Sequence, residues 1–220
     1  MEPNESQRSI YIELKSKSDS NMKTASALRR TWEVDLGVSY TEGEWDRLLR
    51  NFRKMSRELR TRLIQFKILN RVYWTPFRLF KVKLRDCSTC WKCQEGEGTL
   101  MHMLWDCPLI RDFWGEIRDH IERILGYEIP FSPGLYILGD PSFLEDLTPY
   151  DAEWAQTALM LGSELTMCEW RAPSAPSVNV WFTQLGHVAA LERLSFRLLN
   201  KVENYWLKWD KWETHISGTL

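Results

Sequence analysis

Apolar residues recur at helical intervals along almost the whole chain. Between Pro108 and Gly126 they follow one another three or four positions apart, at Ile110, Phe113, Trp114, Ile117, Ile121 and Ile124. Comparable spacing predicts helices over residues 24–37, 42–54, 57–74, 148–171 and 178–212. A short apolar run within residues 129–142 is the one weak strand candidate. The pattern therefore predicts an all-α, helical bundle-like chain.

Residues with strong preferences for helix ends fall at the ends of these segments. Thr41 and Glu44 form the Thr-x-x-Glu pattern of a capping box, so a helix should begin near Glu42. Pro108 suits the first position of a helix, and Gly126 suits the position just after its end. Pro76 should end or kink the helix over residues 57–74, and "PFRLFKVKLRDC" should then form a short helix or an extended arm.

Helical projection assigns a core face to several of these segments. In residues 57–74 the expected core face is Leu59, Leu63, Phe66, Leu69 and Tyr73, and the opposite face carries a basic ridge of Arg57, Arg60, Lys67 and Arg71. The stripe in residues 148–171 is Trp154, Ala158, Leu161, Leu165 and Cys168. Cys168 is therefore expected to pack in the core as a small apolar residue. The last helices should line one side with Leu191, Leu194, Leu198, Val202, Tyr205 and Trp209.

Charge is distributed unevenly, although the net charge is only −1. Residues 47–85 contain thirteen lysines and arginines and one acid, a net charge of +12, whereas residues 1–46 carry −3 and residues 86–220 carry −10. Such a basic band is typical of proteins that bind a polyanion. The alternative is a solvated helix face that pairs with the acidic C-terminal half.

Composition places the chain among ordinary globular proteins of 220 residues, with twelve tryptophans, several of which should lie in the core. No apolar run approaches the roughly 20 residues of a membrane-spanning helix, and the first 20 residues lack the apolar segment of a signal peptide. We therefore expect an intracellular protein with no membrane partner. Thiols stay reduced there, so clustered cysteines favour a metal site over disulfides.

Three cysteines and one histidine fall within eighteen residues, as Cys90-x2-Cys93-x8-His102-x4-Cys107. Three thiolates and an imidazole are a common ligand set for a closed tetrahedral zinc site, which predicts a structural zinc. Gly96 and Gly98 lie between the two pairs, where the chain must reverse. Cys87 forms a second x2 pair with Cys90, so the spacing alone leaves the choice between Cys87 and its neighbours open.

Several stretches, taken together, resemble a known family. "RLIQFKILNRVYWTPFRLFKV", "CWKC", "GTLMHMLWDCP" and "FWGEI" are similar to the C-terminal region of the polyprotein of LINE-type (non-LTR) retrotransposons, most closely those of fish. "WEVDLGVSYTEGEWDRL" resembles the stretch upstream of that block, and "ALMLGSELTMCEWRAPSAPSVNVWFTQL" and "YWLKWDKW" resemble the helical tail downstream. The resemblance covers about residues 28–213. It implies a reverse transcriptase zinc-binding domain with Cys90, Cys93, His102 and Cys107 as ligands, leaving Cys87 outside.

The resemblance also implies an organisation and a function. It divides the chain into a tail (1–27), a basic helical segment (28–86), a CCHC zinc knuckle (87–107), a C-terminal helical segment (108–213) and a second tail (214–220). In that family the region is implied to help a reverse transcriptase domain of the same polyprotein grip template RNA or target DNA. The expected phosphate contacts are Arg53, Arg57, Arg60, Lys67, Arg71, Lys81, Lys83 and Arg85. Trp74 and Trp91 could stack on unpaired bases, although packing is the favoured interpretation for Trp74.

Catalysis is not expected from these residues. The family's polymerase uses a pair of catalytic aspartates, and the sequence contains neither such a pair nor a Gly-rich phosphate loop or an HExxH motif. The prediction is a non-catalytic, zinc-containing, nucleic-acid-binding module. The alternatives are a structural or protein-interaction helical domain and a non-functional retroelement relic.

Overall fold

The computed structural model describes residues 26–54 and 59–218. The chain divides into two compact units between Asp46 and Arg47, and each is described by itself. In both units most of the described residues are helical, as the spacing predicts. Within these ranges the β pairing is confined to one isolated bridge between Thr89 and Glu97.

In the first unit, residues 26–36 form a helix that ends at Gly37, whose φ of 66° is the left-handed conformation favoured by glycine. The chain then enters α2 (Glu42–Lys54), whose residues from Arg47 onward belong to the second unit, through the predicted capping box. The Thr41 N–H donates to Glu44 Oε2 at 2.7 Å, and the Glu44 N–H donates to Thr41 Oγ1 at 3.3 Å. The predicted start and end of this helix are therefore confirmed.

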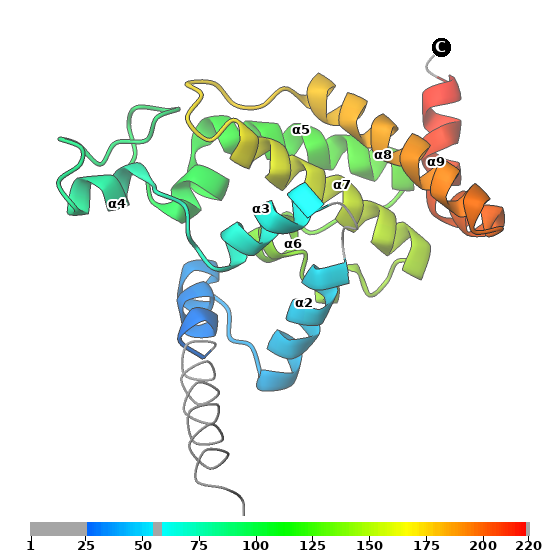
Figure 1. The fold of residues 1–220 in the computed structure, drawn as a ribbon, viewed down its shortest axis with the longest axis horizontal. Coiled ribbons are helices and arrows are strands. Elements are labelled where there is room, and N and C mark those ends of the chain that lie inside the picture. Colours follow the sequence, from blue (N-terminus) through cyan, green and yellow to red (C-terminus); the bar gives the residue numbers. More distant parts are fainter. Residues whose placement is uncertain (1–25, 55–58, 219–220) are drawn as a thin grey trace, which may run out of the picture. The chain divides into compact units, whose positions relative to one another are not determined.

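The second unit is built around α7 (Pro149–Cys168), which Thr148 caps by accepting from the Asp151 N–H. Every residue from Trp154 to Met167 is buried, because α3, α5, α6, α8 and α9 all contact this helix (Figure 1). A helix buried on all sides is the core of its domain. The predicted stripe is thus part of a wider buried surface, except that Cys168 is exposed and its predicted core position is wrong.

The helix α3 (Leu59–Leu69) faces the opposite way from the prediction. Its buried residues are Thr61, Gln65 and Ile68, whereas Leu59, Leu63 and Phe66 are exposed by 80, 50 and 58%. The reason lies on α7, where the buried Glu164 accepts a hydrogen bond from Thr61 Oγ1 at 2.7 Å. A buried carboxylate needs polar partners, so α3 presents polar residues to α7.

Two helices, α5 (Pro108–Leu125) and α6 (Pro133–Leu138), complete the layer around α7. The first has the predicted bounds and the predicted left-handed Gly126 cap. The second replaces the weak strand candidate, which is wrong. Pro133 starts this short helix and the left-handed Gly139 ends it, and the 3-10 helix η2 (Pro141–Leu144) follows. A six-residue helix that is buried almost throughout shows no periodicity that separates it from a strand.

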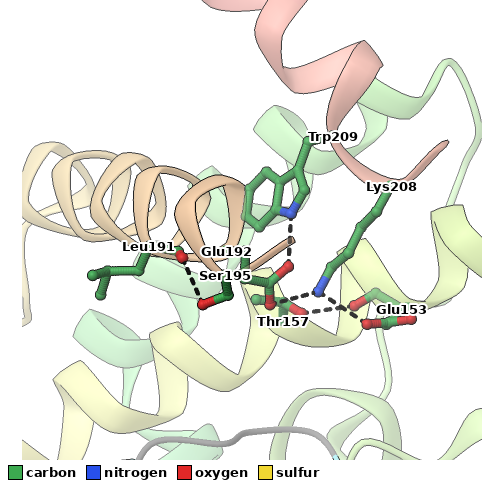
Figure 2. A network of polar contacts seen from close by, with 7 residues as sticks. All are labelled: Glu153, Thr157, Leu191, Glu192, Ser195, Lys208 and Trp209. Atoms are coloured by element: carbon green, nitrogen blue, oxygen red, sulfur yellow. Dashed lines mark hydrogen bonds and ion pairs between the residues drawn. The ribbon is translucent and has the colours of Figure 1, made fainter. Parts of the chain in front are cut away.

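The chain ends with α8 (Val178–Leu198) and α9 (Val202–Gly218), which pack on each other and on α7. Lys208 joins the three helices, because its buried Nζ lies 3.1 Å from Glu153 Oε1 and 3.0 Å from Glu192 Oε1 (Figure 2). Tyr205 and Trp209 are buried as predicted. Leu191, Leu194, Leu198 and Val202 are exposed instead, since α8 buries the face of Trp181, Leu185 and Ala189.

No helix in the described ranges combines the length and the apolar character that crossing a membrane requires.

Candidate metal centre

The first two cysteines of the cluster lie on a tight chain reversal. The Cys90 N–H donates to the Gly96 carbonyl at 2.8 Å, and the Gly98 N–H donates to the Ser88 carbonyl at 2.7 Å. The backbone N–H of Lys92 points at Cys90 Sγ from 3.3 Å. The predicted reversal at Gly96 and Gly98 is therefore confirmed, and it carries Cys90 and Cys93.

The other two candidate ligands lie on η1 (His102–Asp106), a π-helical turn. In an α-helix, residues five apart point about 140° away from each other. Here the Cys107 N–H donates to the His102 carbonyl at 2.8 Å, five residues back, so the wider turn brings both side chains to one side. Pro108 then starts α5, which fixes the position of Cys107.

The four side chains meet at one point. One ligand atom from each of Cys90, Cys93, His102 and Cys107 lies within 4.8 Å of all the others. Cys90 Sγ and Cys107 Sγ are 4.0 Å apart, close to the separation of about 3.8 Å that Zn–S bonds of about 2.3 Å give in a tetrahedron. Cys93 Sγ and His102 Nε2 are 3.3 Å apart. The residues present therefore fit a four-coordinate metal ion.

Glycine is required where the two pairs meet. A Cβ on Gly96 would lie 2.4 Å from His102 Cε1, far inside van der Waals contact. The imidazole therefore occupies the space that a side chain at position 96 would fill. The chain reversal and the π-helical turn are matched to each other at this contact.

The thiols of the centre differ in their electrostatic environment. Burial opposes ionisation of Cys93, but hydrogen bonds from the backbone of Gly96 and Glu95 and from the His102 ring outweigh it and lower the pKa of Cys93 to about 6. Burial raises the pKa of Cys107 to about 11. A cation at the centre would favour the thiolate form of both side chains.

Cys87 lies outside the cluster, which answers the question left open by the spacing. It is exposed, and its Sγ lies 3.1 Å from the Thr89 hydroxyl. The hydrogen bonds with Thr89 lower its pKa. The "CWKC" pair is the one that faces His102 and Cys107.

A buried lysine attaches this centre to the end of α7. Lys92 Nζ donates to the carbonyl oxygens of Glu169, Ala172 and Ser174 at 3.0, 3.1 and 2.7 Å. Burial lowers the pKa of Lys92, although the nearby Glu169, Cys107 and Cys90 oppose that shift. Glu169 is the C-cap residue of α7, and carbonyl groups at a helix C-terminus attract cations, so Lys92 holds the end of α7 together with the segment that follows it.

The basic residues expected to contact phosphate fall into separate groups. Arg57 lies outside the described residues, and Arg53 belongs to α2 without a described side chain. Arg60 points toward α7, where its guanidinium lies 3.2 Å from Cys168 Sγ and 3.9 Å from Glu164. The basic ridge is shorter than predicted, because α3 ends at Leu69. Arg71 lies beyond the helix with a φ of 55°, and Lys67 is half-buried in the last turn of α3.

Lys81, Lys83 and Arg85 lead directly into the candidate metal centre. Thr75 caps α4 (Pro76–Lys81), the short helix expected after Pro76. Figure 1 shows α4 and the loop after it at one side of the helices, at the end away from α9. No described carboxylate lies within 4.0 Å of these three cations. Ion pairs between described residues therefore account for Arg47, which pairs with Glu145, and for Arg60, which pairs with Glu164. They do not account for Lys81, Lys83 and Arg85.

Two tryptophans flank the arm. Trp74 is 54% exposed, with Arg78 Cζ 5.7 Å from its ring centroid, so the favoured packing interpretation is wrong. Trp91, between two ligands, is half-buried against Trp170 at a centroid distance of 6.1 Å. The guanidinium of Arg171 also lies over the Trp91 ring, 5.8 Å from its centroid. Arg171 was not singled out from the sequence. The signal was an arginine directly after Trp170 at the end of a predicted helix.

Fold and site together define an all-α protein with a Cys3His centre that could hold a metal ion. A comparison of the chain with models of known protein families finds no match.

Proposed function

We propose that this chain is a non-catalytic, zinc-containing module that binds nucleic acid. The observation that carries the proposal is the convergence of Cys90, Cys93, His102 and Cys107 at the end of a basic arm (Lys81, Lys83 and Arg85), whose cations have no carboxylate of the described residues within 4.0 Å. Three thiolates and one imidazole favour zinc over Mg²⁺ or Ca²⁺. When bound, zinc would supply a closed structural crosslink that holds the chain reversal against the π-helical turn.

The arm supplies the charge for a polyanion. Lys81 and Lys83 are exposed, and Arg78 and Trp74 lie beside them in the chain with exposed side chains. Cations next to an accessible indole suit a single strand, whose phosphates and unpaired bases are both available. The same region resembles the reverse transcriptase zinc-binding domain of LINE-type retrotransposons, and we propose that origin for the chain. In a parent polyprotein it would assist the reverse transcriptase domain in holding template RNA or target DNA.

The test starts with metal content. The purified, reduced chain should contain one zinc per molecule, the Cys93→Ser variant should lose it, and the Cys87→Ser variant should keep it. Cys87 lies three residues from Cys90 but outside the cluster, so it is a matched control. A folded wild-type chain without metal would contradict the zinc assignment.

The second step is a salt titration of binding to a labelled single-stranded oligonucleotide. If the arm neutralises several phosphates, the logarithm of affinity should fall linearly with the logarithm of salt concentration, by roughly 0.7 per contact. Replacing Lys81 and Lys83 together by glutamine should reduce that slope by roughly 1.4. Weak binding that salt does not change would argue against the proposal.

A protein-interaction domain is the second candidate, and the exposed face of α3 favours it. Leu59, Leu63 and Phe66 form an apolar stripe on that face. Stripes of this kind mark interaction sites more often than scattered apolar residues do. If the oligonucleotide titration fails while Leu63→Glu abolishes self-association or partner capture, this candidate replaces the first.

A further inference from the structure

We propose that Arg85 and Arg171, held on Trp91, form a phosphate clamp for single-stranded nucleic acid, and that Lys92 positions it. The inference rests on the proposed function and adds a site to it. Arg171 comes from the loop after α7, 86 residues beyond the last residue of the basic band, Arg85, and nothing in the charge pattern connects it to nucleic acid.

The two arginines share one indole. Arg85 Cζ lies 5.5 Å from the ring centroid of Trp91, and Arg171 Cζ lies 5.8 Å from it. Their guanidinium carbons are therefore no more than about 11 Å apart, the sum of the two centroid distances, so one nucleic-acid strand can contact both. A guanidinium stacked on an aromatic ring keeps its in-plane N–H groups free for a phosphate. The indole thus holds two donors in place before any ligand binds.

Among the residues that the structure describes, no carboxylate competes for the two arginines. Arg85 donates Nη1 to the Thr89 carbonyl at 2.9 Å, which fixes its side chain and leaves further N–H groups unused. For Arg171, as for Arg85, no described carboxylate lies within 4.0 Å. A positive pair that lacks a counter-charge among the described residues favours an anionic ligand. The exposed cations Lys81 and Lys83 precede Arg85 in the chain, so the ligand that fits is a phosphate chain and not a single anion.

Lys92 sets the position of Arg171. Its Nζ binds the carbonyl oxygens of Glu169 and Ala172, the residues two before and one after Arg171, and also that of Ser174. The backbone around Arg171 is therefore attached to the chain reversal that carries Cys90 and Cys93. Trp170 adds an edge contact to Trp91. Lys92 does not contact the nucleic acid in this arrangement and is a positioning residue.

The experiment measures binding of a fluorescein-labelled 20-nucleotide RNA, and of DNA of the same sequence, to the full metal-loaded chain at several salt concentrations. Arg171→Gln and Arg85→Gln should each weaken binding about tenfold, the loss expected for one charge-assisted hydrogen bond, and should lower the salt slope by roughly 0.7. Arg197→Gln, an exposed arginine at the end of α8, is the matched control and should change neither value beyond the general loss of one charge.

Two further variants separate positioning from charge. Trp91→Leu keeps both arginines, so the salt slope should stay while affinity falls about threefold to tenfold, because the donors lose their pre-organisation. When Lys92→Met is already present, adding Arg171→Gln should change the binding affinity very little, since Arg171 is no longer held at the clamp. Metal content and circular dichroism establish that each variant is folded.

The outcomes are distinct. If the wild-type chain binds steeply with salt but Arg171→Gln and Arg85→Gln behave like Arg197→Gln, the clamp is wrong and the proposed function stands. If the wild-type chain binds neither RNA nor DNA, both fail. Loss of binding in the two glutamine variants together with an unchanged slope in Trp91→Leu supports the clamp.

Discussion

At the scale of single residues, Gly96 determines whether the candidate metal centre can close. The His102 ring occupies the place of a side chain at position 96. Gly96→Ala should therefore displace the imidazole and lower metal affinity at least about tenfold, as losses of ligand orientation usually do. A competition titration with a chromophoric chelator measures this. Gly115→Ala, where an added Cβ meets nothing within 4 Å, should leave the affinity unchanged.

His120 gives the fold a second kind of sensitivity, to pH. Burial lowers its pKa, and the positive charges of Arg123 and His215 lower it further. The unfolded chain therefore takes up a proton at a higher pH than the folded chain does. As pH falls from the unfolded pKa of about 6.5 to the lower folded value, stability is lost.

Removing the His120 imidazole should make the stability of the protein less dependent on pH. His120→Gln should show a smaller decrease in the free energy of unfolding than the wild-type chain between pH 7.5 and pH 5.5, measured by urea denaturation. The metal ligands contribute equally to both proteins, so the difference isolates His120. Equal decreases in the two proteins would show that the histidine is not responsible.

At the scale of elements, α5 and α7 pack closely against each other at Gly162. A Cβ on Gly162 would lie 2.4 Å from Trp114 Cζ3 and 2.9 Å from Ile117 Cδ1. Gly162→Ala should destabilise the protein by about 1–3 kcal/mol, because a packed core does not absorb an added methyl group. Gly115→Ala in α5 should instead stabilise it by up to about 1 kcal/mol through helix propensity. Thermal or urea unfolding of both variants tests the pair, and similar effects would contradict the packing argument.

The positions of the helices could be predicted from the sequence better than the faces that they bury. Caps were readable because they depend on neighbouring residues, as Thr41 with Glu44 and Pro108 with Gly126 show. The buried face of α3 was not readable, because it depends on Glu164, a hundred residues away. Residues 133–138 were ambiguous because a short buried helix has no polar face.

Some parts of the candidate metal centre could also be predicted from the sequence, and others could not. Its four ligands follow from spacing and from the family resemblance, since they lie on two short local turns. Lys92 and Arg171 did not stand out, because their partners are distant in the chain: Lys92 binds carbonyl oxygens 77 to 82 residues away, and Arg171 lies over Trp91. Long-range contacts of this kind leave no periodic signal.

At the scale of the whole molecule, the candidate metal centre and the end of α7 should respond together. If metal binds the folded chain, a chelator removes stabilisation that amounts to about 4 kcal/mol when free metal is a thousandfold above its Kd. Thermal unfolding should shift downward accordingly. Hydrogen exchange should rise in residues 88–107 and also in residues 169–176, which Lys92 holds, while α9 keeps its protection. Unchanged exchange in residues 169–176 would mean that Lys92 does not transmit the loss.

The distribution of the five cysteines has a practical consequence for chemical labelling. Cys87 and Cys168 are exposed, whereas the remaining three belong to the Cys3His cluster. Iodoacetamide should therefore add two carbamidomethyl groups quickly to the loaded chain and five to the stripped, denatured chain. Intact-mass spectrometry of a labelled cell extract would then report what fraction of the protein carries its metal, without purification and without any assay of function.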